Sequence, residues 1–131
     1  MKFIFLRAII MNNTILQTVV ELPEYVRQSV RCMDNKSNKE FVDFIAKSPL
    51  AGEIISGTGG ARKIRWFGIN NKGKSGGVRI IYYYCNREIP IFLFTVYSKN
   101  KKANLTKLER NELKIILKEI VKSYLRRQNY E

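Results

Sequence analysis

The chain has 131 residues, of which 45% are hydrophobic and 27% charged, a composition typical of a globular domain and not of a disordered segment. Its 24 lysines and arginines outnumber its 11 acidic residues, so the formal net charge is +13. Like charges repel in a compact fold, and this excess indicates a polyanionic partner, with nucleic acid favoured over an anionic membrane surface. The chain has no histidine, so any proton transfer near neutral pH must use other side chains.

Cysteine usage and the start of the chain bear on location. Cys32 and Cys85 are the only cysteines and form no CxxC pair, so the sequence predicts neither a disulfide framework nor a zinc site. This fits a reducing, cytoplasmic compartment, and no metal or other cofactor is expected. The apolar start of the chain is broken by Arg7 and is too short to span a bilayer. A signal peptide is the less favoured alternative, because no small-residue cleavage pattern follows.

The organisation of the chain predicts a single domain. Residues 1–13 are interpreted as an N-terminal extension or an upstream start, with Met11 as the alternative initiator. The remainder contains no repeat and no internal linker, and its length leaves room for one core. We therefore expect one domain over residues 14–131.

The first half of the chain predicts one strand followed by two helices. Residues 15–22 are β-branched and favour a strand, and Pro23 is typical of a first helical position. The apolar face of this first helix is predicted to consist of Tyr25, Val26, Val30 and Met33. Residues 37–40 have the pattern of a capping box, which predicts the start of a second helix that ends before Pro49. The apolar side chains of that helix are Phe41, Phe44 and Ile45.

The second half predicts three strands and a terminal helix. Residues 61–67 alternate between cations and apolar side chains, which are Lys63 and Arg65 against Ile64 and Trp66. Further strands are predicted over residues 78–84 and 89–97, the latter apolar on both faces and therefore central. A second capping box at residues 106–109 begins the last helix. The apolar stripe of that helix consists of Leu113, Ile116, Leu117, Ile120, Val121 and Tyr124.

These elements follow the order β-α-α-β-β-β-α. Runs of strands separated from runs of helices are typical of the α+β class. We therefore expect a small antiparallel sheet with its helices on one face.

Residues 68–75 match the phosphate-loop pattern G-x-x-x-x-G-K-S letter for letter. A phosphate loop needs a helix to begin at its Lys-Ser pair, so that backbone amides and the helix dipole meet the phosphates. Here two glycines follow, and strand residues begin at Val78. We interpret the segment as a hairpin connection and not as a nucleoside triphosphate site.

Cations without acidic neighbours mark the second half of the chain. Residues 55–85 hold six cations and no acidic residue, and the cations are Arg62, Lys63, Arg65, Lys72, Lys74 and Arg79. A second acid-free run contains Lys99, Lys101, Lys102 and Lys107. A solvated surface is the ordinary interpretation of such a run, and it stays open for the last three. Lys63, Arg65 and Arg79 occupy alternating strand positions, from which one sheet surface can present them together to an anion.

Four segments that carry these cations resemble the RelE/ParE toxin superfamily, most closely its HigB-like branch. They are residues 57–65, 72–83, 92–99 and 105–109, and the similarity extends from about Thr14 to Arg127. The resemblance implies a RelE-like fold and a toxin of a type II toxin–antitoxin system that cuts mRNA in the ribosomal A site. Its partners would be the ribosome, mRNA and an acidic antitoxin, expected to be of the helix-turn-helix type.

The family's reaction is attack by a ribose 2′-OH on the adjacent phosphate, which needs a base, a cationic cradle and an acid. RelE-type enzymes use lysines, arginines and a tyrosine instead of histidine, in agreement with the composition. Carried over to this chain, the catalytic candidates are Lys63, Arg65, Arg79, Lys99 and Tyr97. The RNA-binding candidates are Arg62, Lys72, Lys74, Lys101 and Lys102.

Individual roles follow from side-chain chemistry. Lys63 is the candidate base, because neighbouring cations favour the neutral form of a lysine. Arg79 is the candidate phosphate clamp, able to donate two parallel hydrogen bonds, and is expected to be exposed on the sheet surface. Tyr97 is expected to orient a base or a phosphate, and a core or interface tyrosine is the open alternative.

Two departures and two alternative functions stay open. The tyrosine in the last helix of RelE has no clear counterpart here, and Arg65 replaces a lysine, so the proton-transfer roles are not assigned uniquely. One alternative is a non-catalytic RNA- or DNA-binding module. The other is a ParE-like topoisomerase poison, against which the set of Lys63, Arg65 and Arg79 argues. The sequence does not indicate a codon preference.

Overall fold

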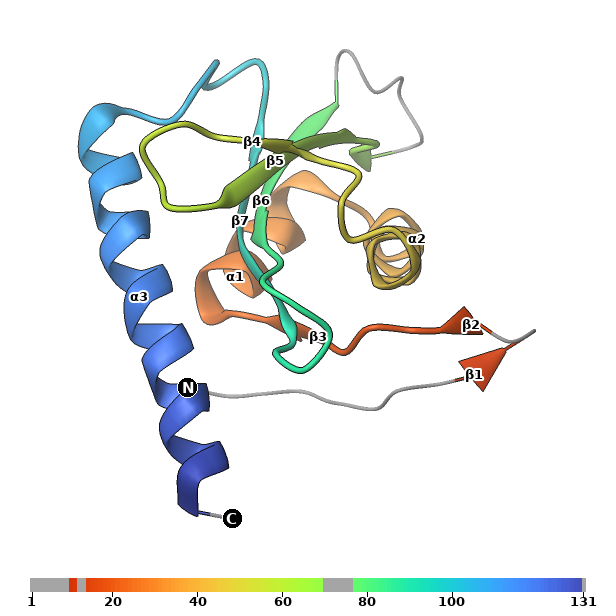
Figure 1. Ribbon diagram of the computed structural model, residues 1–131. Helices are drawn as coiled ribbons and strands as arrows, with labels where there is room; N and C mark the ends of the chain where they lie inside the picture. The colour runs from red at the N-terminus through yellow and green to blue at the C-terminus, as the bar shows by residue number, and fades with distance from the viewer. Residues whose placement is uncertain (1–9, 12–13, 70–76, 131) are drawn as a thin grey trace.

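The computed structural model describes residues 10–11, 14–69 and 77–130 (Figure 1). In chain order the elements are β1 (Ile10–Met11), β2 (Thr14–Ile15), β3 (Val19–Glu21), α1 (Pro23–Cys32), α2 (Asn35–Lys47), β4 (Glu53–Ile54), β5 (Ala61–Trp66), β6 (Val78–Tyr83), β7 (Ile91–Ser98) and α3 (Lys107–Tyr130). β1 pairs with β2, and the other strands form one five-stranded sheet. The predicted α+β class is confirmed, whereas β1, β2 and β4 were not predicted as separate strands.

The sheet has the strand order β3-β7-β6-β5-β4. β3 runs parallel to β7, with Val19 opposite Ile91, and all other neighbours in this sheet are antiparallel. The prediction of a purely antiparallel sheet is therefore wrong. Only strands joined by hairpins have their direction set locally, and β3 reaches β7 through long-range pairing. The strand predicted over residues 89–97 is internal as expected, since β7 lies between β3 and β6.

Helices cover both faces of the sheet, which corrects the prediction of a single covered face (Figure 1). β6 is buried along its whole length, and its alternate side chains enter two different cores. Ile80 and Tyr82 pack on the side of α1 and α2. Ile81 and Tyr83 pack on the opposite side with Leu117 of α3. A central strand that is apolar on both faces requires cover on both.

The buried face of α1 differs from the predicted one. The helix begins at Pro23 as expected. Val26 and Val30 are nevertheless 44% and 78% exposed, and the buried positions within the helix are Tyr25 and Ser29. The apolar residues of this helix are spread around its axis, so the sequence allowed either of two faces to be buried. Packing of the helix against β7 buries the face that carries the Tyr25 ring.

α2 begins earlier than the capping pattern at residues 37–40 predicted. Asp34 is the N-cap, and its carboxylate accepts a hydrogen bond from the backbone N–H of Ser37 at 2.8 Å. The Ser37 hydroxyl instead donates to the carbonyl oxygen of Phe67 at 2.6 Å. The predicted capping box is therefore wrong, because the aspartate already caps the helix and the serine ties α2 to the end of β5.

The start of α3 agrees with the sequence. The Glu109 carboxylate accepts from the backbone N–H of Thr106 at 2.8 Å, and the Thr106 hydroxyl oxygen accepts from the backbone N–H of Glu109 at 3.1 Å. This is the reciprocal capping box predicted at residues 106–109. The predicted stripe faces the sheet except at Ile116, which is 44% exposed. None of the described helices, α3 included, is long and apolar enough to cross a membrane.

The phosphate-loop match joins two strands. β5 and β6 are antiparallel neighbours, with Trp66 opposite Val78, so a strand and not a helix follows the match. The interpretation as a hairpin connection is confirmed on that basis. Residues 70–76, and with them Lys72 and Lys74, lie outside the described residues.

Candidate nucleic-acid interface

Three predicted site residues form a row across the sheet. Arg65 of β5 lies opposite Arg79 of β6, and Arg79 lies opposite Tyr97 of β7. Residues directly opposite on antiparallel strands project from the same face, with Cβ atoms about 4.5–5.5 Å apart. We call this set of Arg65, Arg79 and Tyr97 the Arg-Arg-Tyr row. It lies on the face that α3 partly covers, since Ile81, two residues along β6, packs in the core on that side.

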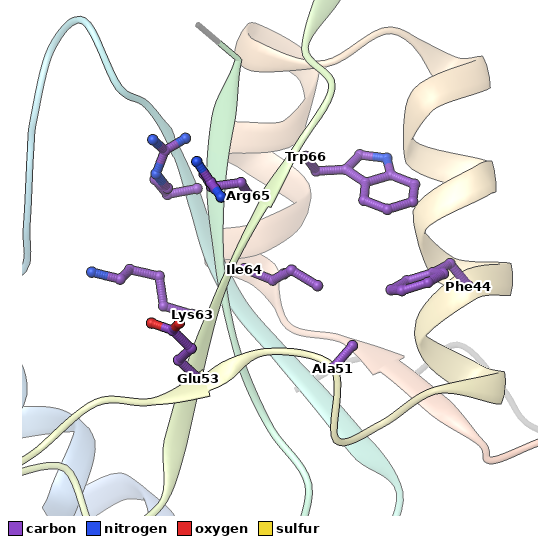
Figure 2. Close-up of a pocket in the computed structure, with 8 residues that line it drawn as sticks. Phe44, Ala51, Glu53, Lys63, Ile64, Arg65 and Trp66 are labelled. Atoms are coloured by element: carbon purple, nitrogen blue, oxygen red, sulfur yellow. The ribbon is translucent and has the colours of Figure 1, made fainter. Parts of the chain in front are cut away.

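A second row lies one step further along the same face. Lys63 of β5 is opposite Ile81 of β6 and, on its other side, opposite Glu53 of β4. Figure 2 shows the Lys63 and Glu53 side chains together on one side of β5. The Lys63 ammonium also donates to the side-chain oxygen of Asn104 at 3.2 Å. Residues 55–85 contain no acidic residue, but in the folded chain the Glu53 carboxylate lies next to Lys63 of this segment.

An irregularity in β7 places Tyr97 in its row. Tyr82 of β6 is opposite Leu93, but the next residue, Ile81, is opposite Thr95, so Phe94 is an extra residue in β7. A bulge of this kind resets the alternation of side chains. In unbroken register Tyr97 would lie opposite Val78, on the other face of the sheet. The bulge thus brings Tyr97 beside Arg79.

Lys63, Arg65 and Arg79 of these rows line a pocket at the edge of β5, whereas Tyr97 does not (Figure 2). Its volume is about 420 Å³, and its lining residues are Phe44, Ala51, Glu53, Lys63, Ile64, Arg65, Trp66 and Arg79. β4 pairs only with Arg62 and Lys63, so the last part of β5 lies at the edge of the sheet here. The pocket therefore reaches both faces of the strand, cationic on one and aromatic on the other.

Arg79 is buried, with 8% of its surface exposed, which corrects the expectation of an exposed arginine. The reason is its position on β6, the central strand, whose two faces are both covered. One of its guanidinium nitrogens donates to the carbonyl oxygen of Val78 at 3.3 Å. A cation that is partly withdrawn from water attracts an anion more strongly than a solvated one does.

Tyr97 presents a buried hydroxyl group. Its oxygen is inaccessible to solvent, and no described residue provides a hydrogen-bond partner for it. Burial raises the pKa of Tyr97; the positive charge of Arg79 lowers it and the negative charge of Glu109 raises it further. The phenol therefore stays protonated at neutral pH.

Lys102 links this row to the start of α3. Its ammonium lies 5.6 Å from the centre of the Tyr97 ring and forms an ion pair with Glu109. Burial alone would raise the pKa of Glu109, but hydrogen bonds from Lys102 and from the backbone of Thr106 lower it below its usual value. The interpretation as a solvated surface does not apply to the half-buried Lys102, whereas Lys101 is exposed.

The remaining predicted residues lie apart from the two rows. Arg62 occupies the other face of β5, where its guanidinium donates to the carbonyl oxygen of Gly52 at 2.7 Å and braces β4. Strand alternation could have indicated this position. Lys99 follows the end of β7 and is exposed. Lys72 and Lys74 fall in the segment that the structure leaves undescribed.

Two features of the site were not predicted from the sequence: the position of Glu53 beside Lys63 and the position of Phe44 in the pocket lining. Glu53 comes beside Lys63 only through the β4–β5 pairing, and a strand of two residues has no recognisable local pattern. Phe44 was assigned to the apolar face of its helix, yet it is half-buried and lines the pocket. No group of three or more His, Cys, Asp or Glu side chains able to hold a metal ion occurs within the described ranges.

No protein-family model matches this chain. The two rows and the pocket define the chemistry available at this site. That chemistry comprises two arginines on neighbouring strands, a lysine beside a carboxylate, a protonated phenol and an aromatic wall.

Proposed function

We propose that the protein is a ribosome-dependent endoribonuclease, the toxin of a type II toxin–antitoxin system of the RelE/HigB kind. It would act in the cytoplasm, bind mRNA in the ribosomal A site and cut it by attack of a ribose 2′-OH on the adjacent phosphate. The support comes from the cationic face of the sheet and from the resemblance of the segments that build it.

One observation carries the proposal, the pairing of Arg65 with Arg79 on neighbouring strands. The two guanidinium groups project from the same face of the sheet, so both are able to meet a single anion. Both side chains, together with Lys63, line one pocket. A phosphodiester offers two oxygens, and guanidinium groups are suited to binding them in parallel.

The reaction assigns a role to each group. Lys63 or the neighbouring Glu53 accepts the proton of the 2′-OH as its oxygen bonds to phosphorus. Arg65 and Arg79 hold the phosphate oxygens as negative charge grows in the transition state. The 5′ oxygen leaves and takes a proton from an acid, for which the Lys63 ammonium is the candidate when Glu53 is the base. Tyr97, opposite Arg79 and with its hydroxyl buried, would act as a positioning residue for that guanidinium. The products are a 2′,3′-cyclic phosphate and a 5′-hydroxyl end.

The partner proposal concerns α3. A groove of about 320 Å³ runs beside this helix, lined by Gly59, Tyr83, Lys114, Leu117, Lys118, Val121 and Lys122. Its lysines recur every four residues, so they follow one side of the helix next to apolar side chains. An acidic, amphipathic segment of a cognate antitoxin fits both the charge and the apolar floor.

Induced expression tests the activity. Growth should stop, and primer extension on a translated message should show cuts in register with the codons, which disappear when the start codon is removed. Lys63→Ala should abolish most of the cutting. Lys36→Ala, which removes an equal charge from the exposed first turn of α2, should leave it unchanged.

Other outcomes identify the alternatives. Equal cutting of untranslated RNA would contradict the dependence on the ribosome. RNA binding without any cutting would indicate the non-catalytic module. DNA breaks that depend on a topoisomerase, with intact mRNA, would indicate the ParE-like function.

A further inference from the structure

The pocket at the edge of β5 has an apolar half that phosphate binding does not use. Phe44 of α2 and Trp66 of β5 form its wall, with ring centroids 5.1 Å apart and planes inclined by 34°. Figure 2 shows these rings across β5 from Lys63 and Arg65, with the Ile64 side chain between the strand and Phe44. An inorganic anion would be bound by the cations alone and would make no favourable contact with these aromatic rings.

Trp66 is held in place, whereas Phe44 remains accessible. The indole N–H donates to the carbonyl oxygen of Ser37 at 3.0 Å, and Trp66 is 7% exposed. Phe44 is half-buried, so part of its ring faces the pocket. An aromatic ring fixed from behind by a second ring is a suitable platform for stacking a flat ligand.

The free edge of β5 adds polar groups to this platform. The carbonyl oxygen of Ala61 accepts from Ile55 N–H at 2.8 Å, so the backbone groups of Ala61 point away from β6. In a regular strand every second residue repeats this direction, which gives Arg65 the same orientation. Because β4 pairs no further than Lys63 on this side, the N–H and C=O of Arg65 lie at the edge beyond it. These groups can bond to the edge of a stacked base.

We propose that the Phe44 side of the pocket is a nucleobase subsite, in which a base of single-stranded RNA stacks on Phe44 while its phosphate is held by Arg65 and Arg79. The strand β5 separates the two halves, so the nucleotide crosses the sheet edge. This inference rests on the proposed function, because it names the part of the same substrate that the cations leave unbound. Every base has an aromatic face, so stacking tolerates different sequences.

Trp66 makes the subsite measurable, since it is the only tryptophan of the chain. A short RNA oligonucleotide should change Trp66 fluorescence, whereas an abasic ribose-phosphate oligomer of equal length should bind the cations without that change. By anisotropy of labelled RNA, Phe44→Leu should lose roughly tenfold in affinity, and the loss should be absent with the abasic oligomer. Phe44→Tyr, which keeps the ring, should retain the affinity.

Tyr84→Leu serves as the matched control, because it removes a half-buried ring that packs on the same core outside this pocket. Thermal melting shows whether each variant is folded. RNA affinity that is unchanged in folded Phe44→Leu, or equal fluorescence changes with both oligomers, would overturn the subsite and leave the proposed function intact. If this edge instead binds a strand of a partner protein, RNA affinity should likewise be unchanged in Phe44→Leu. If the parent protein binds neither oligomer, the subsite is likewise overturned, whereas the proposed function fails only if translated mRNA is not cut.

Discussion

Arg79 is the residue on which the proposed chemistry depends most at the scale of single side chains. Arg79→Lys keeps the charge but loses the fork of donors, and Arg79→Ala loses both, so both should lower mRNA cleavage, Ala more strongly. The loss of one positioned donor of this kind typically costs about 10²–10³ in rate. Cleavage rates of purified variants on translating ribosomes measure this effect.

The stability of the Arg79 variants needs a separate measurement, because the side chain is buried. Arg79→Ala removes the packing of the aliphatic stem but also relieves the repulsion against Arg65. The two effects oppose each other, and we expect the free energy of unfolding to change by less than about 1 kcal/mol. A folded Arg79→Ala variant that cleaves like the parent would disprove the assignment of this residue.

Tyr97 allows a test that separates a functional residue from a structural one. Its hydroxyl is buried without a described partner, and such a group destabilises a fold by roughly 1–3 kcal/mol. Tyr97→Phe should therefore melt at the same temperature as the parent or higher, while RNA cleavage falls. A structural tyrosine would give the opposite pattern, with lower stability and full cleavage.

At the scale of elements, Gly52 determines how closely β4 approaches β5. A Cβ atom at this position would lie 2.8 Å from a ring carbon of Tyr82 and 2.9 Å from the carbonyl oxygen of Lys63. Neither can yield, since one belongs to a fully buried ring and the other to the backbone. Gly52→Ala should push β4 outward, and overpacking of this kind costs about 1–3 kcal/mol.

Denaturant unfolding measures that cost, with Ser56→Ala as the control because this exposed residue lies in the same connection. Cleavage should fall as well, since the displacement carries Glu53 away from Lys63. A Gly52→Ala variant of parental stability would show that β4 does not contact β5 as described.

At the scale of the whole molecule, buried tyrosines predict the alkaline limit of stability. Burial raises the pKa of Tyr25, Tyr82, Tyr83 and Tyr97, and for Tyr83 it reaches about 12, with Cys85 adding to the rise. A group whose pKa is higher in the folded state stabilises the fold fully below its unfolded pKa, about 10, and loses that contribution as pH rises through the folded value. The free energy of unfolding should therefore fall between about pH 10 and 12.

Neutralisation of the many lysines relieves repulsion in the same range, so a comparison of variants is required. Tyr83→Phe removes one ionisation and should lose less stability than the parent over this interval. Phenolate absorbance should show that these tyrosines ionise together with unfolding. Titration of all tyrosines near pH 10 in the folded protein would contradict the prediction.

Local sequence patterns were sufficient to predict much of the secondary structure and the charge of the molecule. The net charge, the cationic and apolar sides of β5, the start of α1 at Pro23 and the reciprocal capping box of α3 all depend on residues close in sequence. Strand alternation and helix capping act over two to four residues, which is why a sequence displays them. The cations of the candidate site were identified on the same basis.

The arrangement of the site was decided by tertiary structure. The bulge at Phe94 brings Tyr97 to Arg79, the β4–β5 pairing brings Glu53 to Lys63, and the packing of α2 brings its Phe44 to the edge of β5. Each of these depends on the register between strands or on the contact of a helix with a sheet. Such register is set by side chains far apart in the chain, and a shift by one residue reverses every side chain in a strand. For that reason the sequence alone indicates the charges of this site but not which groups lie beside them.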